Sequence, residues 1–383
     1  MNFKNLFKRK KPNVILILMD GVRVDSIAGI DYYENLKKEG VFFDNVITYA
    51  PYTIASTHAL FSGLYGNLNG VNGYHKLYSF DKDNCFTLAQ YLKKEGYYTE
   101  ADVIEENVVP AQGFDRLRLY GRKDIDLKER HLEILNQIKS KQPFFLFLDF
   151  EHILPMMQKY VIKGRSDLDE SYFKEKENNM ESYKRFVQLS TDYLSSILSR
   201  LKEFGLYDNS IILIFSDHGC SVGDKFGEKL YGVYLYDYTI RCFLYIIERS
   251  LPKSITISSQ IRNVDILPSI LEILKISPVK GKLPFYGKSF FPIVNGSKEE
   301  RIAYAETGGL GGPTPSPNEH NMQCIRTSKW KLIYNKSTGK RELYDLIKDK
   351  DEEANLAGKG LEAENVLWKD LMELSKQLNF KSK

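Results

Sequence analysis

Residues 13–21, which read NVILILMDG, decide the fold, because a nearly continuous apolar run ends abruptly in a carboxylate. Far along the chain, residues 210–219 read SIILIFSDHG and repeat this construction. Such runs are typical of strands buried on both faces of a parallel sheet. Ligands of open α/β sheets bind beyond the carboxyl ends of the strands. The two tips therefore predict one site that contains Asp20, Asp217 and His218.

The chemistry of these three side chains favours a divalent cation. Two carboxylates and one imidazole suit Mn²⁺, Zn²⁺ or Mg²⁺, and Ca²⁺ also fits where backbone carbonyls join the ligand set. We expect one or two such ions per chain. The pattern indicates metal-assisted chemistry rather than simple core packing.

The remainder of the first three hundred residues alternates between strand and helix patterns, which predicts an α/β fold. We expect a mostly parallel sheet sandwiched by helices over residues 1–307. After a Gly- and Pro-rich stretch at 308–317, the pattern changes to short strands and a terminal helix. Residues 318–383 are therefore predicted to form a small antiparallel α+β subdomain. The expected elements are helices over 32–38, 87–94, 126–139, 266–274 and 361–378, a long helix that ends near 204, and strands over 98–103, 144–148, 242–247, 322–327, 330–334 and 342–344.

Composition excludes some classes of function. The net charge is only +4 over 383 residues, so nothing indicates a nucleic-acid binder. Basic residues gather at positions 4 and 8–11, which we interpret as a solvated terminal segment, with a weak contact to an anionic membrane as the alternative. No signal peptide or transmembrane segment is recognisable, and the four scattered cysteines read as reduced thiols. We therefore expect a cytoplasmic protein.

The candidate nucleophile lies in residues 50–66, which read APYTIASTHALFSGLYG. The pattern predicts a loop that enters a helix, with Thr53 as N-cap. A helix N-terminus presents free N–H groups and a partial positive charge, which suit phosphate or sulfate. A hydroxyl at this position could bind a metal and attack as an alkoxide. The alternative is that Thr53 only caps its helix.

Taken together, four blocks in order resemble the sulfatase branch of the alkaline phosphatase superfamily. They are residues 14–23 (VILILMDGVR), residues 50–65, residues 215–219 (FSDHG) with their continuation to Arg241, and residues 330–334 (WKLIY) with residues 342–345 (ELYD). The resemblance implies that Asp20, Asp217 and His218 hold a divalent cation. It also implies that Thr53 takes the position of the family nucleophile and contacts that cation.

The chain also departs from the sulfatase pattern. Thr53 cannot mature to formylglycine, Thr57 replaces the arginine of the sulfatase signature, and Ala55 replaces its proline. A threonine nucleophile resembles the phosphodiesterase and phosphotransferase members, which bind two metals and have a further histidine after the Asp-His-Gly block. Lys229 stands near the place of that histidine. It is either an oxyanion-binding cation or an ordinary surface lysine.

Further candidate site residues follow the apolar run at 144–148. Asp149 and His152 are of suitable type and lie at a strand end, so they are candidate ligands of a second metal; the alternative is a solvated strand terminus. His58, on the predicted nucleophile helix, is a candidate catalytic residue. His75 and Lys76 are candidates for the mouth of the site. We expect Arg241 to be a structural ion-pair residue.

The leading hypothesis is a metal-dependent hydrolase or transferase of sulfate or phosphate esters, diesters included, in which Thr53 is the nucleophile. Its partner would be a small-molecule or glycan ester. One alternative is a catalytically weakened relative that binds anionic glycans, and another is a phosphomutase on the same fold. Substrate choice is expected in residues 163–185 and 308–317. The natural ester and the oligomeric state stay open.

Overall fold

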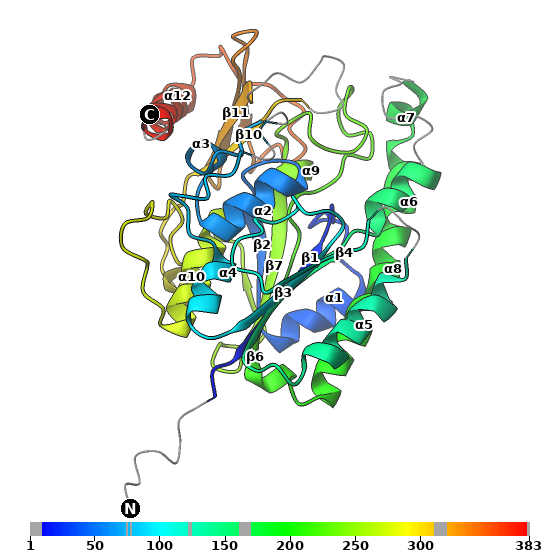
Figure 1. Ribbon diagram of the computed structural model, residues 1–383. Helices are drawn as coiled ribbons and strands as arrows, with labels where there is room; N and C mark the ends of the chain where they lie inside the picture. The colour runs from blue at the N-terminus through cyan, green and yellow to red at the C-terminus, as the bar shows by residue number, and fades with distance from the viewer. Residues whose placement is uncertain are drawn as a thin grey trace, which may run out of the picture.

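The computed structural model describes residues 10–73, 76, 79–121, 125–160, 170–309 and 320–380. The expected positions at His75 and at residues 161–169 and 310–319 lie outside these residues. Within the described ranges, nine strands form one sheet and four strands form a second sheet (Figure 1).

The nine-stranded sheet has the order β4-β3-β5-β1-β6-β7-β2-β8, with β9 also paired to β2. The strands are β1 (Asn13–Met19), β2 (Val41–Ile47), β3 (Tyr98–Val103), β4 (Arg116–Leu119), β5 (Phe144–Phe150), β6 (Ser210–Phe215), β7 (Arg241–Ile247), β8 (Ile255–Ile257) and β9 (Ile261–Arg262). Only β7 runs antiparallel to its neighbours, β6 and β2. The expected α/β class with a mostly parallel sheet is therefore confirmed.

Helices cover both faces of this sheet. The helices of the large domain are α1 (Asp31–Leu36), α2 (Thr53–Ser62), α3 (Gly66–Asn69), α4 (Leu88–Lys94), α5 (Leu127–Ile138), α6 (Ile153–Tyr160), α7 (Glu170–Lys174), α8 (Lys176–Glu203), α9 (Asp237–Ile240), α10 (Ile266–Leu274) and α11 (Phe291–Val294). One apolar core joins the sheet to α1, α5 and α8, and another joins it to α2, α4 and α10 (Figure 1). The part of the 163–185 excursion that is described is helical, in α7 and the start of α8.

The alternation of side chains along β1 explains how the two cores form. Ile15, Ile17 and Met19 face the α8 side, whereas Val14, Leu16 and Leu18 face the α2 side. Each set is fully buried, because helices cover both faces. The near-continuous apolar run is thus the expected composition of a central parallel strand.

The second sheet is antiparallel, with the order β10-β11-β12-β13. Its strands are β10 (Ala303–Thr307), β11 (Met322–Arg326), β12 (Trp330–Asn335) and β13 (Arg341–Asp345), and α12 (Glu362–Phe380) packs on it. This confirms the expected small antiparallel sheet. The sequence pattern missed β10, which precedes the Gly- and Pro-rich stretch and pairs with β11. The domain division itself stays a prediction.

Candidate active site

The carboxylates at the tips of β1, β5 and β6 meet at one edge of the sheet because of strand register. Leu18 pairs with both Asp149 and Phe215 in the parallel ladders. Asp20 and Asp217 each lie two residues beyond these positions, so they continue the rows that face α2. Asp149 follows Phe145 and Phe147 on the same face. The side-chain alternation therefore directs all three carboxylates to the start of α2.

Thr53 completes this cluster. Its Oγ1 donates a hydrogen bond to Asp20 Oδ2 at 3.1 Å and lies 3.3 Å from His218 Nε2. His218 Nε2 is in turn 3.6 Å from Asp20 Oδ1 and 3.6 Å from Asp217 Oδ2. A hydroxyl, an imidazole nitrogen and two carboxylates thus converge on one small volume, as the sequence predicted.

The helix start differs from the expectation in one respect. Tyr52, and not Thr53, is the N-cap residue of α2, and its side chain does not cap the helix. Thr53 is the first helical residue, so its hydroxyl is available to Asp20 and His218. The alternative in which Thr53 only caps its helix is therefore wrong. The first N–H groups of α2 keep their usual capacity to bind an anion.

The unsatisfied atoms of the cluster fit a cation. Asp20 Oδ1, Asp217 Oδ2 and Asp149 Oδ1 are buried without a hydrogen-bond partner in the described structure. Buried carboxylate oxygens without partners carry a high desolvation cost, which a bound cation would offset. One ligand atom from each of Asp20, Asp217 and His218 lies within 4.8 Å of the others.

The surrounding hydrogen bonds orient these groups. His218 Nδ1 lies 2.7 Å from the Gly219 carbonyl, which can only accept, so Nδ1 holds a proton and Nε2 is the ring nitrogen that faces the site. Asp217 Oδ1 accepts from the Gly21 and His218 N–H groups at 3.3 and 2.9 Å, which leaves Oδ2 for the site. Neutral imidazole and a preoriented carboxylate are the forms that ligate metals.

The protonation equilibria reflect the crowding of negative charge. Burial raises the pKa of the Asp20 carboxyl well above its ordinary value, and Asp217, Asp149 and Glu151 add to this shift. Burial, followed by Glu151 and Asp217, likewise raises the pKa of Asp149. Such shifts are expected where carboxylates share a site without a counter-charge.

The two expected ligands after β5 lie in different surroundings. Asp149 is fully buried, and its Oδ2 accepts from Tyr120 Oη at 3.2 Å. His152 is exposed, and its ring lies 5.5 Å from the Phe150 ring, on the row that faces α8. Glu151, on the same row as Asp149, acts electrostatically on both Asp20 and Asp149. Alternation along the strand was the signal that favoured Glu151 over His152.

The two expected catalytic residues are both buried. His58 lies on α2, donates from Nδ1 to the Ile54 carbonyl at 2.8 Å and packs its ring 5.2 Å from Phe80. Burial lowers the pKa of His58 to about 4, so the ring is neutral at pH 7. Lys229 is 7% exposed, on the loop between β6 and α9. Nearby on this loop, the Tyr231 ring lies 4.5 Å from the His218 ring.

The position of the missing signature arginine is occupied by a side chain that faces the protein. Thr57 is 1% exposed, and its Oγ1 donates to the Thr53 carbonyl at 2.9 Å and to the Val108 carbonyl. Thr57 therefore holds α2 against a neighbouring loop. It supplies no positive charge to the site.

Comparison with known proteins identifies the chain. The protein-family model named Sulfatase matches residues 12–276, which is more than half of the sequence. The chain belongs to the sulfatase family. Membership places it among the enzymes that hydrolyse sulfuric esters, a class that usually uses a divalent metal.

Individual relatives agree with this family. An ulvan-active sulfatase of Formosa agariphila is 25% identical, over 91% of this chain and 76% of that protein. A solved structure in complex with its substrate, D-glucosamine-2-N,6-O-disulfate, superposes with a TM-score of 0.76 at 18% identity and covers 97% of this chain and 98% of that one. The phosphonate monoester hydrolase of Agrobacterium radiobacter gives a TM-score of 0.72 at 16% identity and covers 97% and 96%. These structures share the fold.

Proposed function

We propose that this sulfatase-family chain cleaves sulfate or phosphate esters by a two-step transfer through Thr53. The observation that carries the proposal is the place of the Thr53 hydroxyl, 3.1 Å from Asp20 Oδ2 and 3.3 Å from His218 Nε2 at the start of α2. A hydroxyl beside two carboxylates and an oriented imidazole is not explained by capping or packing.

Asp20, Asp217 and His218 are the proposed ligands of a divalent cation, and Asp149 with Glu151 would hold a second one. The cation would neutralise charge on the ester oxygens and lower the pKa of the Thr53 hydroxyl. His152 is a weaker ligand candidate than Glu151, because it is exposed on the other row of β5. The assay described below, in which Mn²⁺, Zn²⁺, Ca²⁺ and Mg²⁺ are added separately, would identify the ion.

The residues of the chain account for the two steps. Thr53 Oγ1 gives its proton to Asp20 and bonds to the sulfur or phosphorus atom, while the bond to the alcohol oxygen breaks and Asp20 passes the proton on to that oxygen. Water then attacks the same atom and gives a proton to Asp20, which returns it to Thr53 Oγ1 as the bond from Thr53 to sulfur or phosphorus breaks. The N–H groups at the start of α2 stabilise the oxyanion. Lys229 is the proposed cation near the ester. His58 is neutral at pH 7, so its proposed role is to support α2 and not to transfer a proton.

The substrate class we propose is an anionic glycan or small-molecule ester, as the names of the relatives suggest. The test is an assay of purified protein with aryl sulfates, aryl phosphates and phosphodiesters, with Mn²⁺, Zn²⁺, Ca²⁺ and Mg²⁺ added separately. Thr53→Ala should abolish turnover, while Thr53→Ser should retain part of it. Turnover of any of these esters by Thr53→Ala at the wild-type rate would refute the nucleophile.

A second candidate function is a weakened relative that binds anionic glycans without cleaving them. The inward-facing Thr57 hydroxyl favours this reading, because the site lacks the charge of the signature arginine. Metal binding without turnover of any ester in the same assay would support this candidate over the enzyme.

A further inference from the structure

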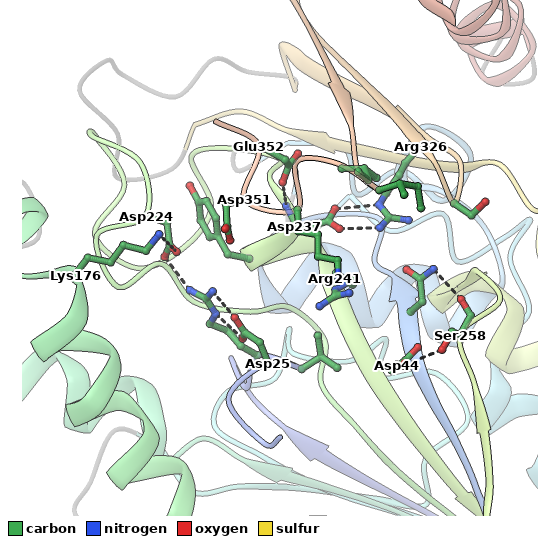
Figure 2. Close-up of a pocket in the computed structure, with 18 residues that line it drawn as sticks. Asp25, Asp44, Lys176, Asp224, Asp237, Arg241, Ser258, Arg326, Asp351 and Glu352 are labelled. Atoms are coloured by element: carbon green, nitrogen blue, oxygen red, sulfur yellow. Dashed lines mark hydrogen bonds and ion pairs between the residues drawn. The ribbon is translucent and has the colours of Figure 1, made fainter. Parts of the chain in front are cut away.

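A hollow, which we call the charged cleft, lies between the large sheet and the four-stranded sheet (Figure 2). Its volume is about 470 Å³, within the size range of small-ligand sites. The loop after β1, the start of α8, α9 and the loop after β13 contribute its walls. None of Thr53, Asp20, Asp217 and His218 lines it, so it is separate from the candidate active site.

One set of charges in the cleft is neutralised internally. Arg23 contacts Asp25 at 2.7 Å and Asp224 at 2.8 Å, and Lys176 lies 3.4 Å from Asp224. The two cations and the two carboxylates cancel each other. This side of the cleft therefore offers little net charge to a ligand.

A second set is neutralised in the same way. Arg326 forms a forked pair with Asp237, at 3.0 and 2.7 Å. Lys331 lies 2.5 Å from Asp237 and 2.7 Å from Glu352. Here too, two cations face two carboxylates, and the donors of Arg326 are directed at protein acceptors rather than at the cleft.

Arg241, the first residue of β7, differs from these cations. Across the described ranges, its guanidinium makes no hydrogen bond and no ion pair within 4 Å, so the expected structural ion pair is reduced to a longer-range attraction to Asp25 and Asp237. Figure 2 shows this side chain directed into the cleft between Asp25 and Asp237, without a dashed line to either. It is half-buried and carries five N–H donors in a planar fork. These donors are available to a ligand.

The neighbours of Arg241 restrict the ligand. Asp25 and Asp237 lie near enough for Arg241 to help lower the pKa of each against the effect of burial, after the stronger effects of Arg23 and Arg326. Their charges would repel a dianion such as a phosphate monoester about twice as strongly as a monoanion, so a ligand group with a single negative charge is favoured. Asp44, which accepts from Ser258 at 3.0 Å, has lone pairs left for a ligand hydroxyl. In this wall, the fork of Arg241 is thus the group left for an anion, and the lone pairs of Asp44 are left for hydroxyls.

The structure assigns the charged cleft to a sugar unit that carries a single negative charge, as a carboxylate or as a sulfate ester. The anionic group pairs with the fork of Arg241, and ring hydroxyls donate to Asp44. Lys350 is exposed at the rim beside Asp351, whose charge offsets it, so this pair adds no net attraction for the ligand. This assignment does not depend on chemistry at Thr53.

The experiment titrates the intact chain with glucuronate, glucose 6-sulfate and glucose. Binding is followed by NMR through the side-chain Nε–H signals of the arginines and by calorimetry. We expect both anionic sugars to shift the Arg241 signal, and glucose to have no effect. Arg241→Gln should weaken binding of the anionic sugars at least about tenfold, because a charged hydrogen-bond donor is lost. A preference for one anion would identify the anionic group, and equal responses would show that the cleft accepts both; either result supports the assignment.

The matched control is Lys348→Gln, on the same loop as Lys350 but 84% exposed and outside the cleft, which should bind as the wild type does. Arg241→Gln should lower the unfolding temperature only slightly, since Arg241 makes no hydrogen bond and acts on Asp25 and Asp237 after the stronger effects of Arg23 and Arg326. Binding that survives Arg241→Gln would place the sugar elsewhere, such as at the catalytic site, and overturn the assignment. No binding of either anionic sugar, or equal binding of glucose, would overturn it as well. Turnover by the Thr53 variants tests the proposed function separately.

Discussion

At the scale of single residues, the alternation of side chains along β1, β5 and β6 determines which carboxylates meet in the candidate site. Asp20, Asp149 and Asp217 all continue rows whose apolar members contact α2 or its neighbours. A shift of one residue would direct them to the α8 side of the sheet. Thr53 then meets them from the helix that covers this face. The site therefore combines strand alternation with one helix start.

Thr53→Ala is the most direct test at this scale. We expect the rate of ester cleavage to fall by several orders of magnitude, because the attacking oxygen is removed. Stability should change by less than about 1 kcal/mol, since the Thr53 side chain does not cap α2. Steady-state kinetics and denaturant unfolding of the same preparations measure both effects. Thr53→Ser, which keeps the hydroxyl, is the control.

Asp217→Asn should separate metal binding from folding. Asparagine keeps the Oδ1 acceptor for the Gly21 and His218 N–H groups, so the fold is preserved. It removes one negative charge from a buried, like-charged cluster, and the metal-free protein should be at least as stable as the wild type. We expect the rise in unfolding temperature on addition of Mn²⁺ or Zn²⁺ after EDTA treatment to be largely lost, together with activity. An unchanged metal response would contradict the ligand assignment.

At the scale of elements, the loop from β6 to α9 supports the site through one buried carboxylate. Glu228 Oε1 accepts from the Val233 and Tyr234 N–H groups at 2.7 and 3.0 Å, and Oε2 accepts from Tyr238 Oη at 2.6 Å. The same loop carries Lys229. Glu228 therefore joins three points of this loop and of α9.

Glu228 makes stability depend on pH. Burial raises its pKa from 4.5 to about 7. The folded state therefore binds a proton more tightly, so this contribution is complete below pH 4.5 and is lost as pH rises through 7. Glu228→Gln keeps the acceptor for both N–H groups and should flatten the decline. Between pH 5 and pH 8 the free energy of unfolding of Glu228→Gln should rise relative to that of the wild type by on the order of 3 kcal/mol. Urea unfolding at the two pH values measures this change. Parallel pH profiles of the two proteins would refute this role.

At the scale of the whole molecule, a buried polar network joins the second sheet to the loop before Thr53. Glu306 on β10 accepts from Tyr49 Oη at 2.9 Å and from Gln323 Nε2 at 2.8 Å. His320 Nδ1 lies 3.8 Å from the same carboxylate, and His320 Nε2 is 2.6 Å from Tyr52 Oη. Tyr52 directly precedes Thr53. The four-stranded sheet therefore positions the start of α2.

Replacement of Glu306 tests this connection. Burial alone would raise the pKa of Glu306, but the interaction with His320 lowers this pKa to about 2. Its contribution to stability is thus present above pH 4.5 and is lost as pH falls towards 2. Glu306→Ala should lower the unfolding free energy at pH 7 by roughly 3–5 kcal/mol, because buried partners lose their acceptor.

Glu306→Gln is the matched control for that loss, and it should cost only about 1–2 kcal/mol. Urea unfolding at pH 7 and pH 3 measures the two variants against the wild type. Equal stabilities of Glu306→Ala and the wild type at pH 7 would show that the network does not join the two sheets.

Within the described residues, no helix is both long enough and apolar enough to cross a lipid bilayer.

Much of the architecture could be predicted from sequence, because buried strands and amphipathic helices have distinct periods. The runs before Asp20 and Asp217 gave two central strands, and α10 was predicted with its observed bounds. β2 and β10 were missed, because their composition is less uniformly apolar than that of the central strands.

Sequence by itself determined the α/β class and the acid-bearing strand tips, since both depend on local patterns of apolar and polar residues. Only the tertiary structure decided that Thr53 opens its helix without capping it, and that Arg241 makes no ion pair within 4 Å among the described residues. These outcomes depend on which face each side chain presents and on how distant segments pack. Such relations arise from register and long-range contacts, which a linear pattern does not contain.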